Sequence, residues 1–173
     1  ALAKGCIEGA VTDLVRAERM QAKGTPLMYV SATNTYWQLI SNRLARVKEI
    51  NQLSDKMIAM TRYSATDYLA TLAIDSAKPK YDVYRIQIND VVLRLHMLLN
   101  NEMDAMLLTE PQATTARLYK NPVLMDSRDK DIRFGVLVFR TKALKDKRRQ
   151  IQLKVFIKAY NMACDSLNTK GLQ

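Results

Sequence analysis

The sequence predicts an α/β protein built from βαβ units in two lobes. Apolar runs of roughly four to six residues alternate with segments of helical period along the whole chain, and this alternation is typical of βαβ architecture. The 173 residues are 48% hydrophobic and 25% charged, with five Gly and four Pro, which excludes disordered, collagen-like and disulfide-framework proteins. One polar, weakly periodic segment, residues 42–56, separates two series of units and is the best candidate for a passage between lobes.

The first series of elements lies before this passage. We expect a strand at 6–11 and a helix over 14–23, with Gly24 as its C-cap. A second strand covers 26–32, and residues 35–41 extend it.

The second series begins with a strand at 57–61 and ends with a long strand at 134–141. Ser64 or Thr66 is expected to cap a helix that runs to about Ala77. Asn89 or Asp90 caps the next helix, and Pro111 lies in the first turn of a third. The other strands are expected at 83–88, 104–109 and 122–127. Residues near 32–41 and 134–141 are expected to pair antiparallel as two strands that cross between the lobes.

The end of the chain predicts an amphipathic, basic helix. Its apolar stripe, at spacings of three and four, comprises Leu153, Phe156, Ile157, Tyr160, Cys164 and Leu167. Residues 141–173 hold eight Lys or Arg against two Asp or Glu, so +6 of the net +10 lies there. We favour a helix that packs on the core with a solvated basic face over a membrane-surface helix, a partner helix or a phosphate-binding surface. The first 140 residues lack the spread basic face of a nucleic-acid groove, so we expect no nucleic-acid partner.

Little in the sequence indicates catalysis, a cofactor or a metal. The glycines match no phosphate-binding loop, and the single histidine, His96, lies mid-helix, where a packing or surface role is favoured over catalysis. Cys6 and Cys164 are too far apart for metal-ligand spacing, and we favour two buried thiols over one long-range disulfide. Asp126, Asp129 and Asp131 are interpreted as solvated turn residues. The longest apolar run, GVLVF, is too short to span a membrane, and no signal peptide is visible; either none existed or it has been removed.

Small polar residues gather where predicted strands end and helices begin. In an open α/β sheet, ligands bind at the carboxyl ends of the strands, where free helix N–H groups favour anions. For any one of these residues, helix capping is an equal alternative to ligand binding. We expect Tyr63 of the TRYSATDY segment, Tyr36 or Trp37 to supply aromatic contact. The predicted ligand-binding residues are Asp13, Thr33, Asn34, Tyr63, Ser64, Thr66, Asn89 and Glu110.

Several short motifs resemble those of the type 2 periplasmic solute-binding proteins of ABC importers. LLNNEMDAMLLTEP is similar to the family's "L-x-x-G-x-x-D-A", strand and Glu-Pro, although Asn101 stands where Gly is frequent. VLMDS is similar to its "vl-D-S" strand, and ALAKGCIEGAVTD to its "AL-x-x-G-x-x-D-x-x-x-x-D", with Glu8 replacing Asp. AKGTPLMYVSAT resembles the strand that crosses between lobes, and KMIAMTRYSATDYL the first strand and helix of lobe two. The branch it resembles most binds nitrate, sulfonates, taurine or thiamine-pyrimidine precursors.

The resemblance implies a two-lobed type 2 fold with an incomplete first lobe, as if the chain were an internal portion of such a protein. Residues 1–36 would be part of lobe one with the first crossing strand, 37–134 lobe two, and 135–173 the return strand and a lobe-one helix. The implied function is a non-enzymatic receptor that captures a small polar or anionic ligand between its lobes and delivers it to an ABC permease. It would be a monomer, in the periplasm or on the cell surface as a lipoprotein.

Two rival functions remain on the same fold. A ligand-sensing domain of a transcription regulator would have a DNA-binding segment elsewhere in the gene. A biosynthetic enzyme for thiamine or menaquinone precursors would need reactive residues, and one His with no Cys cluster argues against it.

Overall fold

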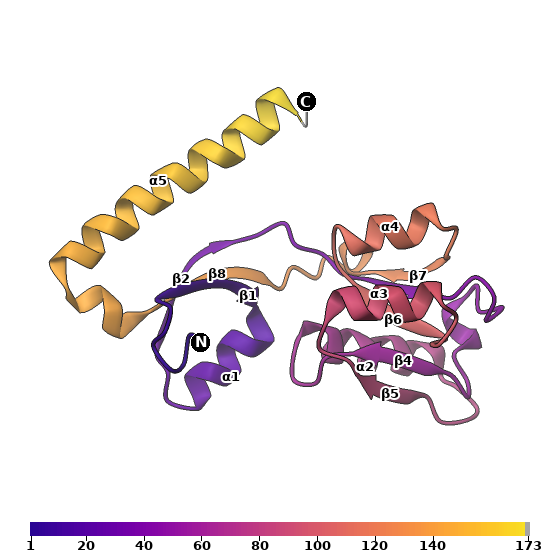
Figure 1. Ribbon diagram of the computed structural model, residues 1–173. Helices are drawn as coiled ribbons and strands as arrows, with labels where there is room; N and C mark the ends of the chain where they lie inside the picture. Colours follow the sequence, from indigo (N-terminus) through magenta and orange to yellow (C-terminus); the bar gives the residue numbers. More distant parts are fainter. Residues whose placement is uncertain (172–173) are drawn as a thin grey trace.

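The protein contains two β-sheets joined by two chain crossings, as seen in a computed structural model that describes residues 1–171 (Figure 1). The smaller sheet has three strands in the order β1-β8-β2, and the larger has five in the order β5-β4-β6-β3-β7. The chain passes from the small sheet to the large one through residues 33–37 and returns through residues 127–134. The mixed α/β class predicted from the sequence is confirmed.

The small sheet combines both ends of the chain. Its central strand β8 (Gly135–Arg140) pairs antiparallel with β1 (Gly9–Asp13) and with β2 (Leu27–Ala32). Helix α1 (Leu14–Ala22) follows β1 and packs its fully buried Ala17 against this sheet.

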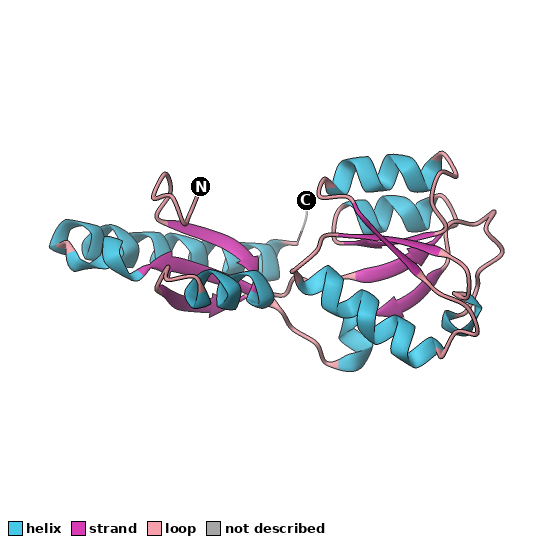
Figure 2. Cartoon of the chain, turned by 90° about the horizontal axis from the view of Figure 1, so that it is seen from below, coloured by secondary structure: helices cyan, strands magenta, loops and turns pink. Residues whose placement is uncertain are grey.

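The large sheet contains the other five strands, and three helices pack on it. Strand β4 (Met57–Met60) runs parallel to β5 (Tyr84–Gln87) and to β6 (Ala105–Leu108), while β3 (Gln38–Ser41) is antiparallel to β6 and to β7 (Val123–Asp126). Figure 2 shows helices on both faces of this sheet. They are α2 (Ala65–Ala77) on one face, and α3 (Val91–Leu99) and α4 (Gln112–Leu118) on the other.

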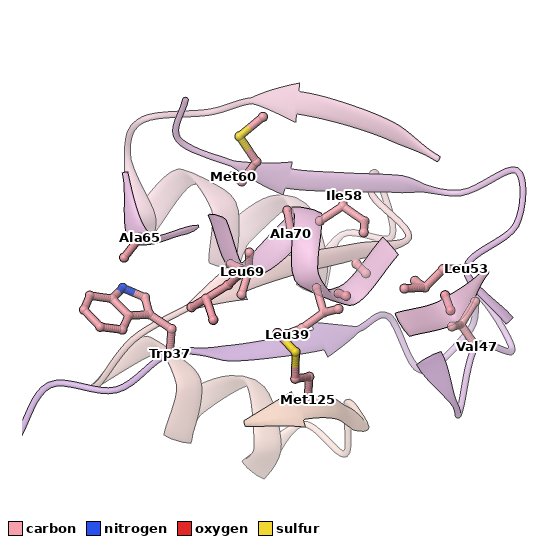
Figure 3. Packing of buried hydrophobic residues seen from close by; sticks show 14 residues of the cluster. Trp37, Leu39, Val47, Leu53, Ile58, Met60, Ala65, Leu69, Ala70 and Met125 are labelled. Atoms are coloured by element: carbon pink, nitrogen blue, oxygen red, sulfur yellow. The ribbon is translucent and has the colours of Figure 1, made fainter. Parts of the chain in front are cut away.

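The alternation of side chains along the central strands explains these two layers. Successive strand residues point to opposite faces, and both faces of a sheet with parallel crossovers are buried. Leu39 and Ile58 pack with Leu69 of α2 on one face (Figure 3), and their neighbours Ile40 and Ala59 pack with α3 and α4 on the other. The continuous apolar runs in the sequence are therefore strands buried on both sides.

Helices α1, α2 and α3 each begin at a polar side chain that accepts hydrogen bonds from the first turn. Asp13 caps α1, Ser64 caps α2 and Asp90 caps α3. These caps satisfy N–H groups that have no partner inside the helix. The caps expected at Ser64 and Asp90 are confirmed, and Pro111 precedes α4 as its N-cap.

The predicted pairing of the crossing strands is corrected in one respect. Strand β8 does pair antiparallel with the strand before the crossing, but that strand is β2, ending at Ala32. Residues 38–41, which we expected to extend it, form β3 in the large sheet between β6 and β7. All four of these residues are buried, which a strand inside a sheet covered on both faces requires.

Smaller differences concern the ends of elements. The first strand covers Gly9–Asp13 rather than 6–11, because its register against Gly135–Phe139 of β8 starts there. Lys23 is the C-cap of α1, and Gly24 follows it with a φ of 84°. Residues 42–56 are not the passage between lobes that we expected: they join β3 to β4 within the large sheet and contain one short 3₁₀ turn, Ile50–Gln52, while the chain crosses between the sheets at residues 33–37.

The last helix and the cysteines contradict the sequence-based expectation. Helix α5 (Lys147–Lys170) follows a short 3₁₀ segment, Thr141–Lys145, and extends away from both sheets (Figure 1). Its N-terminal half contacts the small sheet: Arg149 Nη1 lies 2.9 Å from Glu8 Oε1, and Phe156 packs edge-on against Phe139 of β8. Its stripe does not pack on a core: no described residue of α5 belongs to the buried cluster of the small sheet, and Leu167 is 58% exposed. Cys6 is exposed, Cys164 is partly exposed, and both are free thiols rather than buried ones.

Candidate ligand-binding cleft

A cleft of about 280 Å³ lies between the two sheets. Its walls come from the ends of β1, β4, β5 and β6, from the starts of α1, α2 and α3, and from the first crossing. Because β4, β5 and β6 are parallel, their carboxyl ends meet at one edge of the large sheet. The polar side chains that line the cleft are Thr12, Asp13, Arg16, Thr35, Trp37, Thr61, Ser64, Thr66, Asn89, Arg94 and Thr109.

Asp13 joins the starts of two helices across the cleft. Its Oδ1 accepts a hydrogen bond from the backbone N–H of Arg16 in α1 at 2.9 Å and from that of Ala65 in α2 at 3.0 Å. The Arg16 Nε lies 3.4 Å from its Oδ2. Asp13 is 6% exposed, so its charge is stabilised chiefly by these two helix N-termini and by Arg16. A carboxylate of the chain itself therefore occupies the N-terminus of α2.

Arg94 places a buried positive charge in the cleft wall. It lies on α3, is 6% exposed, and donates from Nη1 to the Leu107 carbonyl oxygen at 2.7 Å. Its Nε is buried without a hydrogen-bond partner, and within residues 1–171 it forms no ion pair. Burial and the nearby positive charge of Arg16 lower the pKa of Arg94 to about 10, against a smaller opposing effect of Asp90. A ligand with negative charge would supply the partner that this guanidinium lacks.

The hydroxyl groups at the start of α2 are already engaged with the chain. Ser64 Oγ donates to the Thr61 carbonyl oxygen at 2.7 Å and lies 2.9 Å from Thr66 Oγ1. Thr66 Oγ1 in turn accepts from the Thr61 N–H at 2.9 Å. Both residues line the cleft, but these bonds fix the turn after β4 and favour the capping interpretation.

Four predicted ligand residues do not line this cleft. Thr33 lies in the first crossing, where its Oγ1 is 2.9 Å from that of Thr35. Asn34 lines a separate hollow beside Tyr36. Tyr63 is 58% exposed, and the Arg19 guanidinium lies 3.5 Å from its ring centroid. Of the predicted set, the cleft brings together Asp13, Ser64, Thr66 and Asn89.

Glu110, the fourth of these residues, belongs to a polar network where the first crossing enters the large sheet. Its Oε1 accepts from the Tyr36 hydroxyl and from Arg117 Nη2, and its Oε2 from the Thr114 N–H at 3.0 Å. Burial alone would raise the pKa of Glu110, but hydrogen bonds from Tyr36, Thr114 and Arg117 outweigh it and lower the pKa to about 2.

Asp126 continues this network and is not a solvated turn residue. It is buried, accepts from Gln38 Nε2 at 2.6 Å and pairs with Arg128 Nη2 at 2.6 Å. The Arg128 guanidinium lies 3.8 Å from the Tyr36 ring centroid, which links Asp126 to the Glu110 side. Burial works against ionisation, yet the bonds from Arg128 and Gln38 lower the pKa of Asp126 to about 2. The network holds the crossing against β7 and α4.

Sequence reasoning missed the two arginines of the cleft. Arg94 lies in VVLRLHMLL, three residues after Val91 and four before Leu98, on the apolar side of the predicted helix. A charged residue on the buried face of an amphipathic helix was the available signal. No such signal marked Arg16, because a basic residue in the first turn of a surface helix is common. His96 is exposed, which fits the surface role that was one of its two expected roles.

Residues 1–171 offer no other obvious chemical centre. Within them, no three His, Cys, Asp or Glu side chains gather closely enough to hold a metal ion. Over the same residues, no helix combines the length and hydropathy needed to cross a membrane.

Comparison with known proteins identifies solved structures with a similar fold. No protein-family model and no curated protein matches the sequence. The periplasmic aliphatic sulphonate binding protein SsuA from Escherichia coli matches with a TM-score of 0.73 at 18% identity, over 98% of this chain and 59% of that protein. The alkanesulfonate-binding protein SsuA from Xanthomonas axonopodis pv. citri, bound to MOPS, matches with a TM-score of 0.78 at 17% identity over the same shares.

A ligand-binding component of an ABC-type import system from Staphylococcus aureus, with zinc bound, matches with a TM-score of 0.71 at 19% identity. It aligns over 86% of this chain and 53% of that protein. The chain thus has the fold of type 2 periplasmic solute-binding proteins and spans little more than half the length of these relatives. The similar structures are mostly binding proteins rather than enzymes.

Proposed function

We propose that this chain is part of a solute-binding receptor that captures a small anionic ligand between two lobes and delivers it to an ABC importer. In this proposal residues 1–36 and 135–173 belong to lobe one, and residues 37–134 form lobe two. The observation that carries it is the cleft between the sheets, in which Arg94 is buried without a counter-charge.

The geometry suits binding better than chemistry. The cleft offers a guanidinium, several hydroxyls and the indole of Trp37, all of which can hold a ligand by hydrogen bonds or contact. It contains no histidine or cysteine that could act as base or nucleophile, and the single histidine is exposed on α3. We therefore propose a binding receptor rather than an enzyme.

We propose the cellular location and the partner by analogy with proteins of the same fold. The solved relatives include ligand-binding components of ABC import systems and periplasmic binding proteins. We propose an extracytoplasmic location, in the periplasm or at the cell surface as a lipoprotein, a permease partner, and a monomeric receptor. Fractionation of cells tests the location, and cross-linking tests the permease partner.

Calorimetric titration tests the capture of an anion. The purified protein is titrated with methanesulfonate and with a cation of similar size, methylammonium, while the fluorescence of Trp37 is followed. Binding of methanesulfonate with a change in emission supports the proposal. Binding of methylammonium instead, or of neither ion, would contradict it.

Variants at Arg94 supply the control. Arg94→Met keeps a long apolar stem but removes the charge, so methanesulfonate binding is expected to weaken by at least about a hundredfold. Arg133→Met, at a 74% exposed side chain outside the cleft, removes the same charge and is expected to leave the binding unchanged.

A further inference from the structure

Asp13 lies where an anionic ligand would otherwise bind. The first N–H groups of a helix attract anions, and α2 directs its Ala65 N–H at the cleft edge. That N–H is already bonded to Asp13 at 3.0 Å, so the chain supplies its own anion at this point. The free positive charge of the cleft is left to Arg94.

The charges that line the cleft do not cancel. Of its thirteen lining residues, only Asp13, Arg16 and Arg94 carry charge. Asp13 pairs with Arg16, whose Nε lies 3.4 Å from Oδ2. Arg94 has no such partner, and the repulsion from Arg16 contributes to its lowered pKa. The lining therefore carries one uncompensated positive charge.

We propose that Asp13 sets the charge of the ligand, restricting the cleft to anions with a single negative charge. This inference rests on the proposed function as an anion receptor. A monoanion neutralises Arg94, whereas a dianion brings an excess negative charge close to the carboxylate of Asp13, which is itself 6% exposed, so that the repulsion is screened less than between charges in bulk water. Asp13 acts through the field it imposes and through the position it gives to Arg16.

The test compares two oxyanions of the same tetrahedral sulfur. Methanesulfonate carries one negative charge and sulfate carries two at neutral pH. The ratio of their dissociation constants is measured by calorimetry at fixed ionic strength for the wild type and for Asp13→Asn. Asparagine is as good a helix cap as aspartate and keeps the Oδ1 acceptor for both N–H groups, so the variant is expected to fold.

The matched control is Asp90→Asn. Asp90 also caps a helix, accepting from Val92 and Leu93 at 2.8 and 3.1 Å, and its charge also acts on Arg94. It is exposed and does not line the cleft. Its substitution removes the same charge from the protein, so it separates a local effect from a change in net charge.

The wild type is expected to bind methanesulfonate more tightly than sulfate. In Asp13→Asn the ratio is expected to move by at least about tenfold toward sulfate, and in Asp90→Asn by less than about threefold. A wild type that prefers sulfate, or an unchanged ratio in Asp13→Asn, would overturn the inference and leave anion capture standing. A wild type that binds neither anion would overturn both.

Discussion

Replacing Arg94 by methionine is expected to make the protein more stable while it weakens anion binding by at least about a hundredfold. The side chain is 6% exposed, and its pKa is lowered from 12.5 to about 10. A difference of one in pKa corresponds to about 1.4 kcal/mol, so the buried charge costs about 3 kcal/mol of folding free energy. Losing the hydrogen bond to the Leu107 carbonyl oxygen lowers the free energy of unfolding by about 1.5–3 kcal/mol, because the donor is charged, and this offsets part of the gain. The expected net change is a gain of about 1 kcal/mol in the free energy of unfolding.

Urea denaturation measures this change from the midpoint at constant slope. The pKa of Arg94 is lowered in the folded protein, so the charge penalty is fully present below about pH 10 and is relieved only as the pH rises toward 12.5. The gain should therefore be the same at pH 6 and pH 8. Arg16→Met, which removes a 47% exposed side chain, is expected to change stability by less than about 1 kcal/mol. A loss of more than about 1 kcal/mol in Arg94→Met would refute the argument that this charge is uncompensated.

Three further changes test the crossing and the caps. A Cβ at Gly135 would meet Thr33 Oγ1 at 2.1 Å and Thr35 Cβ at 2.8 Å, so Gly135→Ala is expected to lower the free energy of unfolding by about 1–3 kcal/mol; an unaltered urea midpoint would contradict the close crossing. The folded pKa of Glu110 lies near 2, below its ordinary 4.5, so the stability it adds is present above pH 4.5 and is lost as the pH falls toward 2. Glu110→Gln should flatten acid unfolding curves in that range, and curves that stay parallel would argue against the network. Ser64→Ala is expected to cost about 0.5–2 kcal/mol through the lost cap, with methanesulfonate affinity retained; a tenfold weaker affinity at an unchanged melting temperature would make Ser64 a ligand residue instead.

The elements of this fold were largely predictable because their signals are local. The runs at 57–61 and 104–109 became β4 and β6 within a residue or two, and α2 begins at one of its two expected caps. Each depends on hydrophobic periodicity and on a cap within a few residues of the chain. The assignment of residues 38–41 was wrong because strand partners are chosen by distant segments, and an apolar run alone does not say which sheet it joins.

The candidate site was predictable only in part for a related reason. Strand ends and helix starts can be identified from sequence, so Asp13, Ser64, Thr66 and Asn89 were expected near one another and do line one cleft. Whether a polar group there is already bonded depends on its neighbours in space. Glu110 looked equivalent in sequence, yet Tyr36 and Arg117 bind it outside the cleft.

The sequence by itself determined the α/β class, the order of strands and helices and the caps, because these depend on residues within a few positions of one another. The tertiary structure alone decided that Asp13 reaches the N–H of Ala65, 52 positions away, and that Arg94 is buried without a counter-charge. It also decided that the stripe of α5 joins no core within residues 1–171 and stays partly exposed. Burial and charge pairing are properties of the assembled neighbourhood, and the free energy of a charge depends on that neighbourhood rather than on its position along the chain.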